Sequence, residues 1–361
     1  MSRLGISIYP EHSSLNDNKA YIAKAASVGF TRIFTCLLSV EGSKEQIVSE
    51  FKAMIDYAHQ YNMEVIVDVA PMVFEKLDIS YQDLSFFKEI GVDGIRLDEG
   101  FDGLKEAVMT YNKEGLKIEV NASLANGYID NILSHYPALE NLITCHNFYP
   151  QKYTGLSAEH FHLCNQKIKA KSLKVAAFVS SQVKDSYGPW PVNEGLCTLE
   201  EHRELPIDVQ IRHLAAMQEV DDIIIANAYA SNEELEICAK INPNLLTFKI
   251  DFEKELHPTE EKVIYQHEHY VRGDMSAYMA RSTFPRVTYA DLSVPSANTR
   301  DLRRGDVIVV NDNYSRYKGE LQIILKDMPN DGRKNVIGRI PDNELMLLDY
   351  LKPWRSFAFM K

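Results

Sequence analysis

The stretch that decides the fold is residues 94–123, GIRLDEGFDGLKEAVMTYNKEGLKIEVNAS. It holds two short apolar runs, Gly94–Asp98 and Lys117–Ala122, separated by a segment with helical spacing of apolar residues. A strand, a helix and another strand in this order predict two parallel strands joined by a right-handed crossover.

The same unit recurs along residues 1–240. Amphipathic helical patterns such as Asn18–Val28, Lys44–Tyr61 and Ile207–Gln218 separate the strand candidates. The candidates are Leu4–Ile8, Arg32–Cys36, Glu64–Val69, Gly94–Asp98, Lys117–Ala122, Leu142–Asn147, Lys174–Val179 and Asp222–Ala226. Eight near-regular units favour a closed TIM (β/α)8 barrel over an open doubly wound sheet. The turn after the first strand, residues 9–13, has no glycine, so a nucleotide cofactor is not indicated.

The pattern changes near residue 245. Leu246–Phe252 is predicted to be one more strand, and short strands separated by turn signals dominate after it. These strands are Arg286–Tyr289, Val307–Asn311, Leu321–Leu325, Asn335–Ile340 and Ser356–Phe359. We therefore predict a TIM barrel catalytic domain over residues 1–252 and a small, mostly antiparallel β domain over residues 253–361.

Composition limits the partners. The chain has 361 residues and a formal net charge of -12, which disfavours nucleic acid and anionic membranes as partners. The first residues lack the pattern of a signal peptide, and no apolar run is long enough to span a bilayer. The five cysteines are odd in number and scattered. We expect a reduced, cytoplasmic protein that acts on a small molecule, and the oligomeric state, a homo-oligomer included, stays open.

Polar side chains gather at the predicted C-terminal strand ends, where TIM barrels hold their sites. Charged groups inside a strand are costly to bury without partners, so the wet mouth of the barrel is the cheapest place for them. The candidates are Tyr9, Asp68, Arg96, Asp98, Glu119, Asn121, Asn147 and Tyr149.

Asp98 and Glu119 lie on neighbouring predicted strands. Because strands are spaced about 4.8 Å apart, carboxyls at similar height would be roughly 5 Å apart, as in a retaining glycosidase. The alternative is a network of Arg96 with carboxylates that only holds the barrel mouth together.

The sequence lacks the residues that Schiff-base or metal-dependent chemistry would need at the mouth of the barrel. Lys117 and Lys174 stand at strand starts, the wrong end for a Schiff base. His160 and His162 lie in a helical stretch, where side chains two residues apart diverge, and surface histidines are the simpler interpretation. His146 is interpreted as a packed residue. We expect no metal and no cofactor.

An arginine-containing stretch follows residue 252. Arg272 and Arg281, with serine and threonine nearby, fit a phosphate site, because guanidinium groups pair bidentately with such oxyanions. Exposed charge beside a turn is the alternative. The loops after the seventh and eighth strands lack the glycines of the usual barrel phosphate site, so we expect the second domain to supply part of the clamp.

Five motifs together resemble one bacterial family over essentially the whole chain. They are GISIYPEHS (5–13), GIRLDEGF (94–101), IEVNAS (118–123), HNFYP (146–150) and RGDMSAYMARST (272–283). The family is domain of unknown function 871, some of whose members were labelled outer surface proteins, and it is associated with the 6-phospho-N-acetylmuramidases of glycoside hydrolase family 170. The resemblance implies a TIM barrel followed by a cyclophilin-like β domain. It also implies cleavage of N-acetylmuramic acid 6-phosphate from N-acetylglucosamine, during peptidoglycan (cell-wall) recycling in the cytoplasm.

For this activity we expect Asp98 and Glu119 to be catalytic, with Glu119 favoured as the acid and the other carboxylate as nucleophile or stabiliser. The substrate acetamido group is an alternative nucleophile. Arg272 and Arg281 would hold the phosphate, and the sugar would be bound by Tyr9, Asp68, Arg96, Asn121, Asn147 and Tyr149. A sugar-phosphate binding or sensing protein, or a sugar-phosphate isomerase or epimerase, remains an alternative function.

Overall fold

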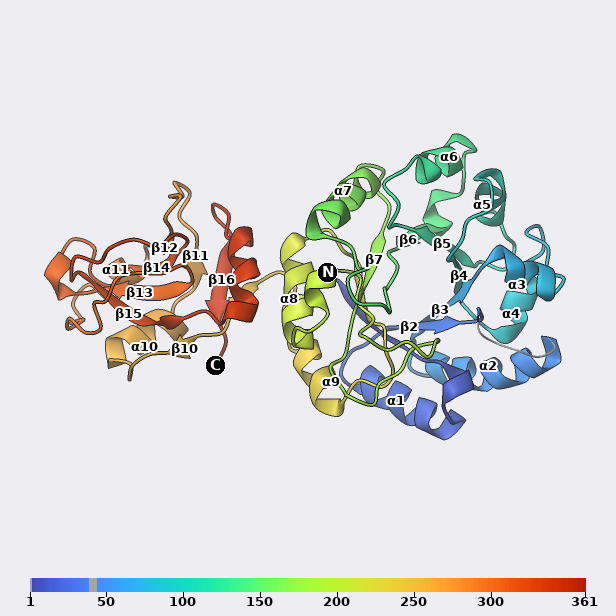
Figure 1. Cartoon of the computed structure of the whole chain (residues 1–361), viewed down its shortest axis with the longest axis horizontal. Helices are drawn as coiled ribbons and strands as arrows, with labels where there is room; N and C mark the ends of the chain where they lie inside the picture. Colours follow the sequence, from blue (N-terminus) through green and yellow to red (C-terminus); the bar gives the residue numbers. More distant parts are fainter. Residues whose placement is uncertain (1, 39–43) are drawn as a thin grey trace. The chain divides into compact units, whose positions relative to one another are not determined.

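The computed structural model describes residues 2–38 and 44–361. The chain divides into two compact units. The barrel unit comprises residues 1–214 and 218–241, and the β unit comprises residues 215–217 and 242–361 (Figure 1). Among the described residues, no helix has both the length and the apolar character needed to cross a membrane.

Eight parallel strands close the barrel in sequence order, and β1 pairs with β8 through Arg3 and Asp222. This confirms the predicted TIM barrel. The strands are β1 (Arg3–Ser7), β2 (Arg32–Cys36), β3 (Glu64–Val69), β4 (Gly94–Leu97), β5 (Lys117–Asn121), β6 (Leu142–Cys145), β7 (Val175–Val179) and β8 (Asp222–Ile225). Their side chains are almost entirely buried, which explains why near-continuous apolar runs marked them in the sequence.

The helices of the barrel unit surround the strands (Figure 1). They are α1 (Leu15–Ser27), α2 (Lys44–His59), α3 (Pro71–Lys76), α4 (Ser85–Ile90), α5 (Leu104–Met109), α6 (Tyr128–Ser134), α7 (Ala158–Lys169), α8 (Ile207–Met217) and α9 (Asn232–Ala239). Short 3-10 helices are η1 (Pro10–His12), η2 (Leu139–Asn141) and η3 (Glu200–His202). Serine hydroxyls cap several of the longer helices by accepting a backbone N–H of the first turn, as Ser14 does for α1.

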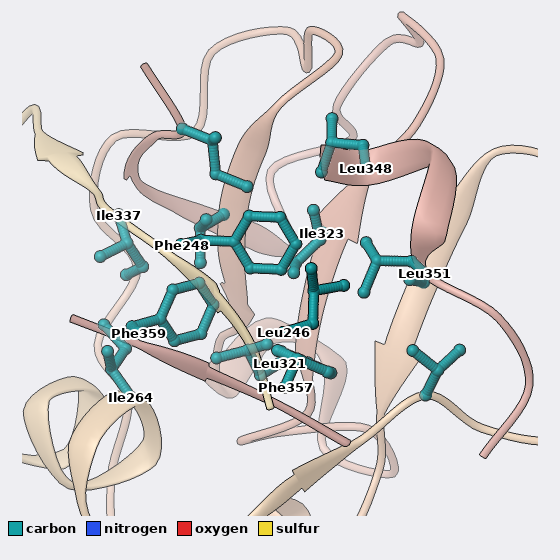
Figure 2. Packing of buried hydrophobic residues seen from close by; sticks show 14 of the residues in the cluster. Leu246, Phe248, Ile264, Leu321, Ile323, Ile337, Leu348, Leu351, Phe357 and Phe359 are labelled. Atoms are coloured by element: carbon teal, nitrogen blue, oxygen red, sulfur yellow. The ribbon is translucent and has the colours of Figure 1, made fainter. Parts of the chain in front are cut away.

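The β unit contains two sheets. A five-stranded sheet has the order β10-β15-β13-β14-β12, and a three-stranded sheet has the order β11-β16-β9. Their strands are β9 (Leu246–Phe248), β10 (Asp251–Phe252), β11 (His269–Tyr270), β12 (Met279–Ser282), β13 (Asp306–Val310), β14 (Leu321–Ile324), β15 (Lys334–Arg339) and β16 (Ser356–Phe359). The helical segments are α10 (Pro258–Tyr265), α11 (Pro285–Thr288), η4 (Asp312–Tyr314) and η5 (Asp342–Tyr350). Phe248, Phe357 and Leu321 meet in its buried apolar core (Figure 2).

Two sequence expectations differ from the structure here. Arg286–Tyr289 is not a strand: the short helix α11 begins at Pro285, whose ring fixes φ at a helical value. The predicted boundary at residue 252 also differs, because β9 pairs with β16 and β10 pairs with β15, both inside the β unit. An apolar run predicts a strand but not the sheet that the strand joins.

Candidate active site

The register between β4 and β5 sets the height of the charged side chains in the barrel. Arg96 stands opposite Glu119, and Leu97 stands opposite Val120. The next residue of each strand brings Asp98 level with Asn121. Asp98 therefore stands two residues, about 6.6 Å, closer to the mouth than Glu119.

Arg96 is the centre of a polar cluster at the mouth. One of its guanidinium nitrogens, Nη1, donates to Asp68 Oδ1 at 2.6 Å and to Asp98 Oδ1 at 3.0 Å. The other, Nη2, donates to the side-chain oxygen of Asn147. Asn121 Nδ2 donates to the backbone oxygen of Asp98 at 3.4 Å. Residues of β3, β4 and β5 and of the segments after β4 and β6 are thereby tied together. The sequence predicted that these residues, Asp68, Arg96, Asp98, Asn121 and Asn147, gather at the mouth.

Asp68 and Asp98 share Arg96 but differ in exposure. The Asp68 side chain is 2% exposed, whereas the Asp98 side chain is 34% exposed. Burial raises the pKa of Asp68 from 3.8 to about 7, although the Arg96 guanidinium acts in the opposite direction. Of the two carboxylates, Asp98 is thus the one that a ligand can reach, whereas Asp68 is buried behind it against Arg96.

Asp98 lines a cavity of about 500 Å³ at the mouth, which we name the carboxylate pocket. Its lining combines two carboxylates, three amides, two aromatic rings and a leucine: Asp98, Glu99, Gly100, Phe101, Asn121, Leu124, Asn126, Tyr128 and Asn147. Amides and carboxylates that converge between apolar and aromatic walls suit a sugar, which presents hydroxyls at its edge and C–H groups on its faces.

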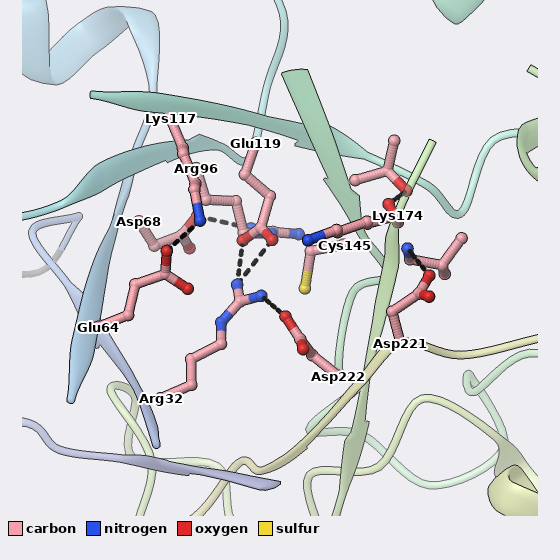
Figure 3. Close-up of polar contacts among 12 residues, drawn as sticks. Arg32, Glu64, Asp68, Arg96, Lys117, Glu119, Cys145, Lys174, Asp221 and Asp222 are labelled. Atoms are coloured by element: carbon pink, nitrogen blue, oxygen red, sulfur yellow. Dashed lines mark hydrogen bonds and ion pairs between the residues drawn. The ribbon is translucent and has the colours of Figure 1, made fainter. Parts of the chain in front are cut away.

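Glu119 does not reach this pocket. Its side chain is 0% exposed, and both of its oxygens accept from Arg32 Nη2, at 2.6 and 2.7 Å. Arg32 Nη1 donates to Asp222 Oδ2 at 2.6 Å, so the guanidinium lies between two carboxylates inside the barrel (Figure 3). The predicted pairing of Asp98 with Glu119 is therefore not formed, because alternation along a strand gives the face of a side chain and not its height.

The other predicted residues lie outside the carboxylate pocket. The Tyr9 hydroxyl is fully buried and donates to the backbone oxygen of Ala226 at 2.5 Å. Tyr149 is partly buried, and this burial raises the pKa of its phenol. Arg272 and Arg281 belong to the β unit, where both form ion pairs with Asp274.

Glu99 also lines the pocket, although the sequence predicted no role for this carboxylate at the strand end. Alternation along the strand puts it on the face opposite Asp98, but β4 ends at Leu97, so that rule no longer holds at residue 99. The signal that could have revealed it is the position of two adjacent carboxylates directly after the strand.

One group in the described part of the chain has the composition of a metal site. Glu201, His202 and His213 bring potential ligand atoms within 4.8 Å of one another. His202 Nε2 and His213 Nδ1 are 2.8 Å apart and share a hydrogen bond, and burial lowers the pKa of His202 far below its ordinary value. The hydrogen bond between the two imidazoles accounts for their close approach.

The fold and the pocket together define a (β/α)8-barrel protein with an acidic site at the C-terminal ends of its strands. The chain belongs to the 6-phospho-N-acetylmuramidase family. The family model of the N-terminal domain matches residues 4–240, and the model of the C-terminal domain matches residues 246–360. The family name describes a glycosidase.

Two solved structures are similar over the whole chain. The crystal structure of an uncharacterized B. cereus protein has a TM-score of 0.93 at 50% sequence identity, and the match covers 100% of both chains. A conserved protein of unknown function from Enterococcus faecalis has a TM-score of 0.74 at 25% identity, covering 100% of this chain and 96% of that one. No curated protein matches the chain.

Proposed function

We propose that this protein hydrolyses the glycosidic bond between N-acetylmuramic acid 6-phosphate and N-acetylglucosamine. The observation that carries the proposal is the carboxylate pocket, where Asp98 and Glu99 meet at the mouth of a barrel whose family is named for this activity. Two carboxylates at the scissile bond are what glycoside hydrolysis requires.

The surroundings of the two carboxylates suggest their roles. Asp98 is oriented and charge-paired by Arg96, which suits a group that stays ionised and stabilises the positive charge developing at the anomeric carbon. Glu99 is exposed and has no ion pair with any described residue, which leaves its carboxyl free to approach the glycosidic oxygen.

In the proposed reaction, Glu99 gives its proton to the glycosidic oxygen as the bond from that oxygen to the anomeric carbon breaks. Asp98 either bonds to that carbon or orients the substrate acetamido group that does so. Water then adds to the anomeric carbon and gives a proton back to Glu99, while the bond from that carbon to Asp98 or to the acetamido oxygen breaks. N-acetylglucosamine and the phosphorylated sugar are thereby released. Asn121 and Asn147 would position the sugar, and Asp68 would hold Arg96.

Cytoplasmic peptidoglycan recycling is the setting that we propose, because a phosphorylated disaccharide is a charged molecule that does not cross membranes unaided. We also propose that the β unit is a cyclophilin-like domain.

Incubation with the phosphorylated disaccharide tests the proposal by the release of N-acetylglucosamine. Asp98→Asn and Glu99→Gln should each lower kcat by about 100- to 10,000-fold, while Asp56→Asn, an exposed change on α2, should leave it unaltered. Near-normal turnover in either pocket variant removes that residue from the mechanism. Tight binding of the disaccharide without release would favour a sugar-phosphate sensor, and rearrangement of a monosaccharide would favour an isomerase.

A further inference from the structure

A second cavity lies at the C-terminal ends of β7 and β8, on the same rim of the barrel as the carboxylate pocket. It has a volume of about 250 Å³, and we name it the lysine pocket. Its lining is almost entirely polar and includes Lys152, Lys184, Arg203, Glu194, Glu204 and Asn227.

The two pockets differ in charge. The lysine pocket is lined by three cations and two carboxylates, whereas the carboxylate pocket is lined by two carboxylates and no cation. An anionic group on a ligand is therefore repelled by Asp98 and Glu99 and attracted toward β7 and β8. This difference is notable in a chain whose net charge is -12.

Lysines are the cations of this pocket that can bind a ligand. Lys184 is exposed and forms no ion pair with any residue that the structure describes. Lys152 Nζ contacts Glu204 at 2.9 Å, but both side chains are substantially exposed, so exchange of this partner costs little.

The guanidinium of Arg203 already donates hydrogen bonds to protein groups, so it contributes its positive charge to the pocket rather than a direct bond to a ligand. Its Nε and Nη2 donate to Glu200 at 2.7 and 2.6 Å. Its Nη1 donates to the backbone oxygens of Tyr149, Glu194 and Gly195. The guanidinium thus holds the loops around the pocket together.

Side-chain hydrogen bonds hold the loop after β7 in place. In other barrels this region is a glycine-rich loop that binds phosphate through its backbone. Asn227 Oδ1 accepts from the Ser181 backbone N–H at 2.7 Å, and Asn227 Nδ2 donates to Ser186 Oγ at 2.7 Å. Glu234 accepts from Ser181 Oγ at 2.6 Å and from the Gln182 backbone N–H at 2.9 Å. A pocket held in place before binding loses less entropy when a ligand binds.

From these observations we propose that the lysine pocket binds the 6-phosphate of the sugar, with Lys184 and Lys152 as its ligands. This inference rests on the proposed function and names the group that makes the enzyme select a phosphorylated substrate. Barrels commonly bind phosphate after strands 7 and 8, and here lysine side chains would take the role of a glycine-rich backbone.

Selectivity for the phosphate is the quantity to measure. The ratio of kcat/KM for the disaccharide with and without its 6-phosphate should fall about 10- to 100-fold in Lys184→Ala, and further in the double variant with Lys152→Ala. The loss should appear mainly in KM, and Lys184→Arg should restore part of the ratio. Lys113→Ala, an exposed lysine in the turn between α5 and β5, is the matched control and should keep the wild-type ratio.

Inorganic phosphate provides a second readout that needs no turnover. Its dissociation constant, measured by calorimetry, should rise about 10-fold or more in Lys184→Ala and stay unchanged in Lys113→Ala. If the wild type cleaves the disaccharide but both lysine variants keep the ratio, and Arg281→Ala lowers it instead, the phosphate binds in the β unit and the inference is wrong. If the wild type cleaves nothing yet loses phosphate binding in Lys184→Ala, the proposed function fails and the phosphate site stands.

Discussion

Asp98 and Glu119 lie on neighbouring strands but differ in what their charges do. Asp98 lines the carboxylate pocket, whereas Glu119 neutralises a buried guanidinium. The loss of a buried charge partner commonly costs 3–5 kcal/mol, while partly exposed pairs contribute about 1 kcal/mol or less. Because their surroundings differ, substitution of Glu119 should mainly lower stability, whereas substitution of Asp98 should mainly lower activity.

We predict that Glu119→Gln lowers the free energy of unfolding by about 3 kcal/mol, because Arg32 loses one of its two buried carboxylates. Asp98→Asn should change it by less than about 1 kcal/mol while abolishing most activity. Urea unfolding beside a turnover assay separates the two effects. A stable Glu119→Gln protein without activity would instead return Glu119 to the catalytic machinery.

The pH dependence of stability should report Asp68. Because its pKa is raised to about 7 in the folded state, the folded protein holds this proton more tightly than the unfolded chain does. That contribution is fully present below pH 3.8 and is lost as the pH rises through 7. The shift corresponds to about 4 kcal/mol.

Asp68→Asn should therefore flatten the fall in unfolding free energy between about pH 4 and pH 7. Unfolding curves at several pH values check this, with Asp56→Asn as the control that should retain the wild-type slope. An unchanged slope in Asp68→Asn would mean that the carboxyl is ionised throughout this range.

For single residues, the sequence predicted which residue types gather at the mouth of the barrel but not which carboxylates lie together there. Asp68, Asp98, Asn121 and Asn147 follow from the rule that the site of a barrel lies at the C-terminal ends of its strands. Glu119 obeys the same alternation, yet Arg32 and Asp222, distant in sequence, make its position inside the barrel favourable. A pairing that depends on three strands cannot be read from one of them.

Residues at the N-terminus of helix α9 contact a loop that lines the lysine pocket. Ser231 and Glu234 form a capping box, and Glu234 also accepts hydrogen bonds from Ser181 and Gln182 of the loop after β7. The element thus combines an ordinary helix cap with support for a loop of the proposed phosphate site.

We predict that Ser231→Ala costs about 1 kcal/mol of stability and leaves KM for the phosphorylated disaccharide unchanged. Glu234→Ala should cost more, about 2 kcal/mol, and should raise that KM, because the loop loses two acceptors. Ser14→Ala removes the corresponding cap of α1 and serves as the control, because Ser14 lines neither the carboxylate pocket nor the lysine pocket. Equal KM values in all three variants would show that α9 does not support binding.

Elements with a strong repeating pattern were the ones that the sequence predicted well. The bounds of β2, β3 and β16 agree with their predicted ranges, and the other barrel strands differ by one or two residues at their ends. The segment at Arg286–Tyr289 is short, and its β-forming residues are outweighed by Pro285 at the first helical position. Brief segments therefore remain ambiguous where a single residue decides between strand and helix.

At the scale of the whole molecule, each unit has its own apolar core. The core of the β unit includes Phe248 and Phe357, and an interior cluster of the barrel unit includes Phe34 and Phe178. The sequence change near residue 245 indicated this division, although the strand that follows it belongs to the β unit. Separate cores predict that the two units can lose their structure in separate transitions.

The chain provides a reporter for each transition, since it has two tryptophans and they lie in different units. Trp190 packs near Phe148 in the barrel unit, with ring centroids 5.7 Å apart, and Trp354 lies in the β unit. In a Trp190→Phe background, fluorescence reports the β unit, and in a Trp354→Phe background it reports the barrel unit.

Phe248→Ala should lower the free energy of unfolding of the β unit by about 3–5 kcal/mol, because it removes a fully buried ring from a packed core. The denaturant midpoint followed by Trp354 should fall accordingly, while the midpoint followed by Trp190 should stay at its value without the substitution. Phe34→Ala, in the barrel unit, is the reciprocal variant and should reverse the pattern. If both midpoints move together in both variants, the two units unfold as one cooperative structure, and the division at residue 242 describes geometry but not stability.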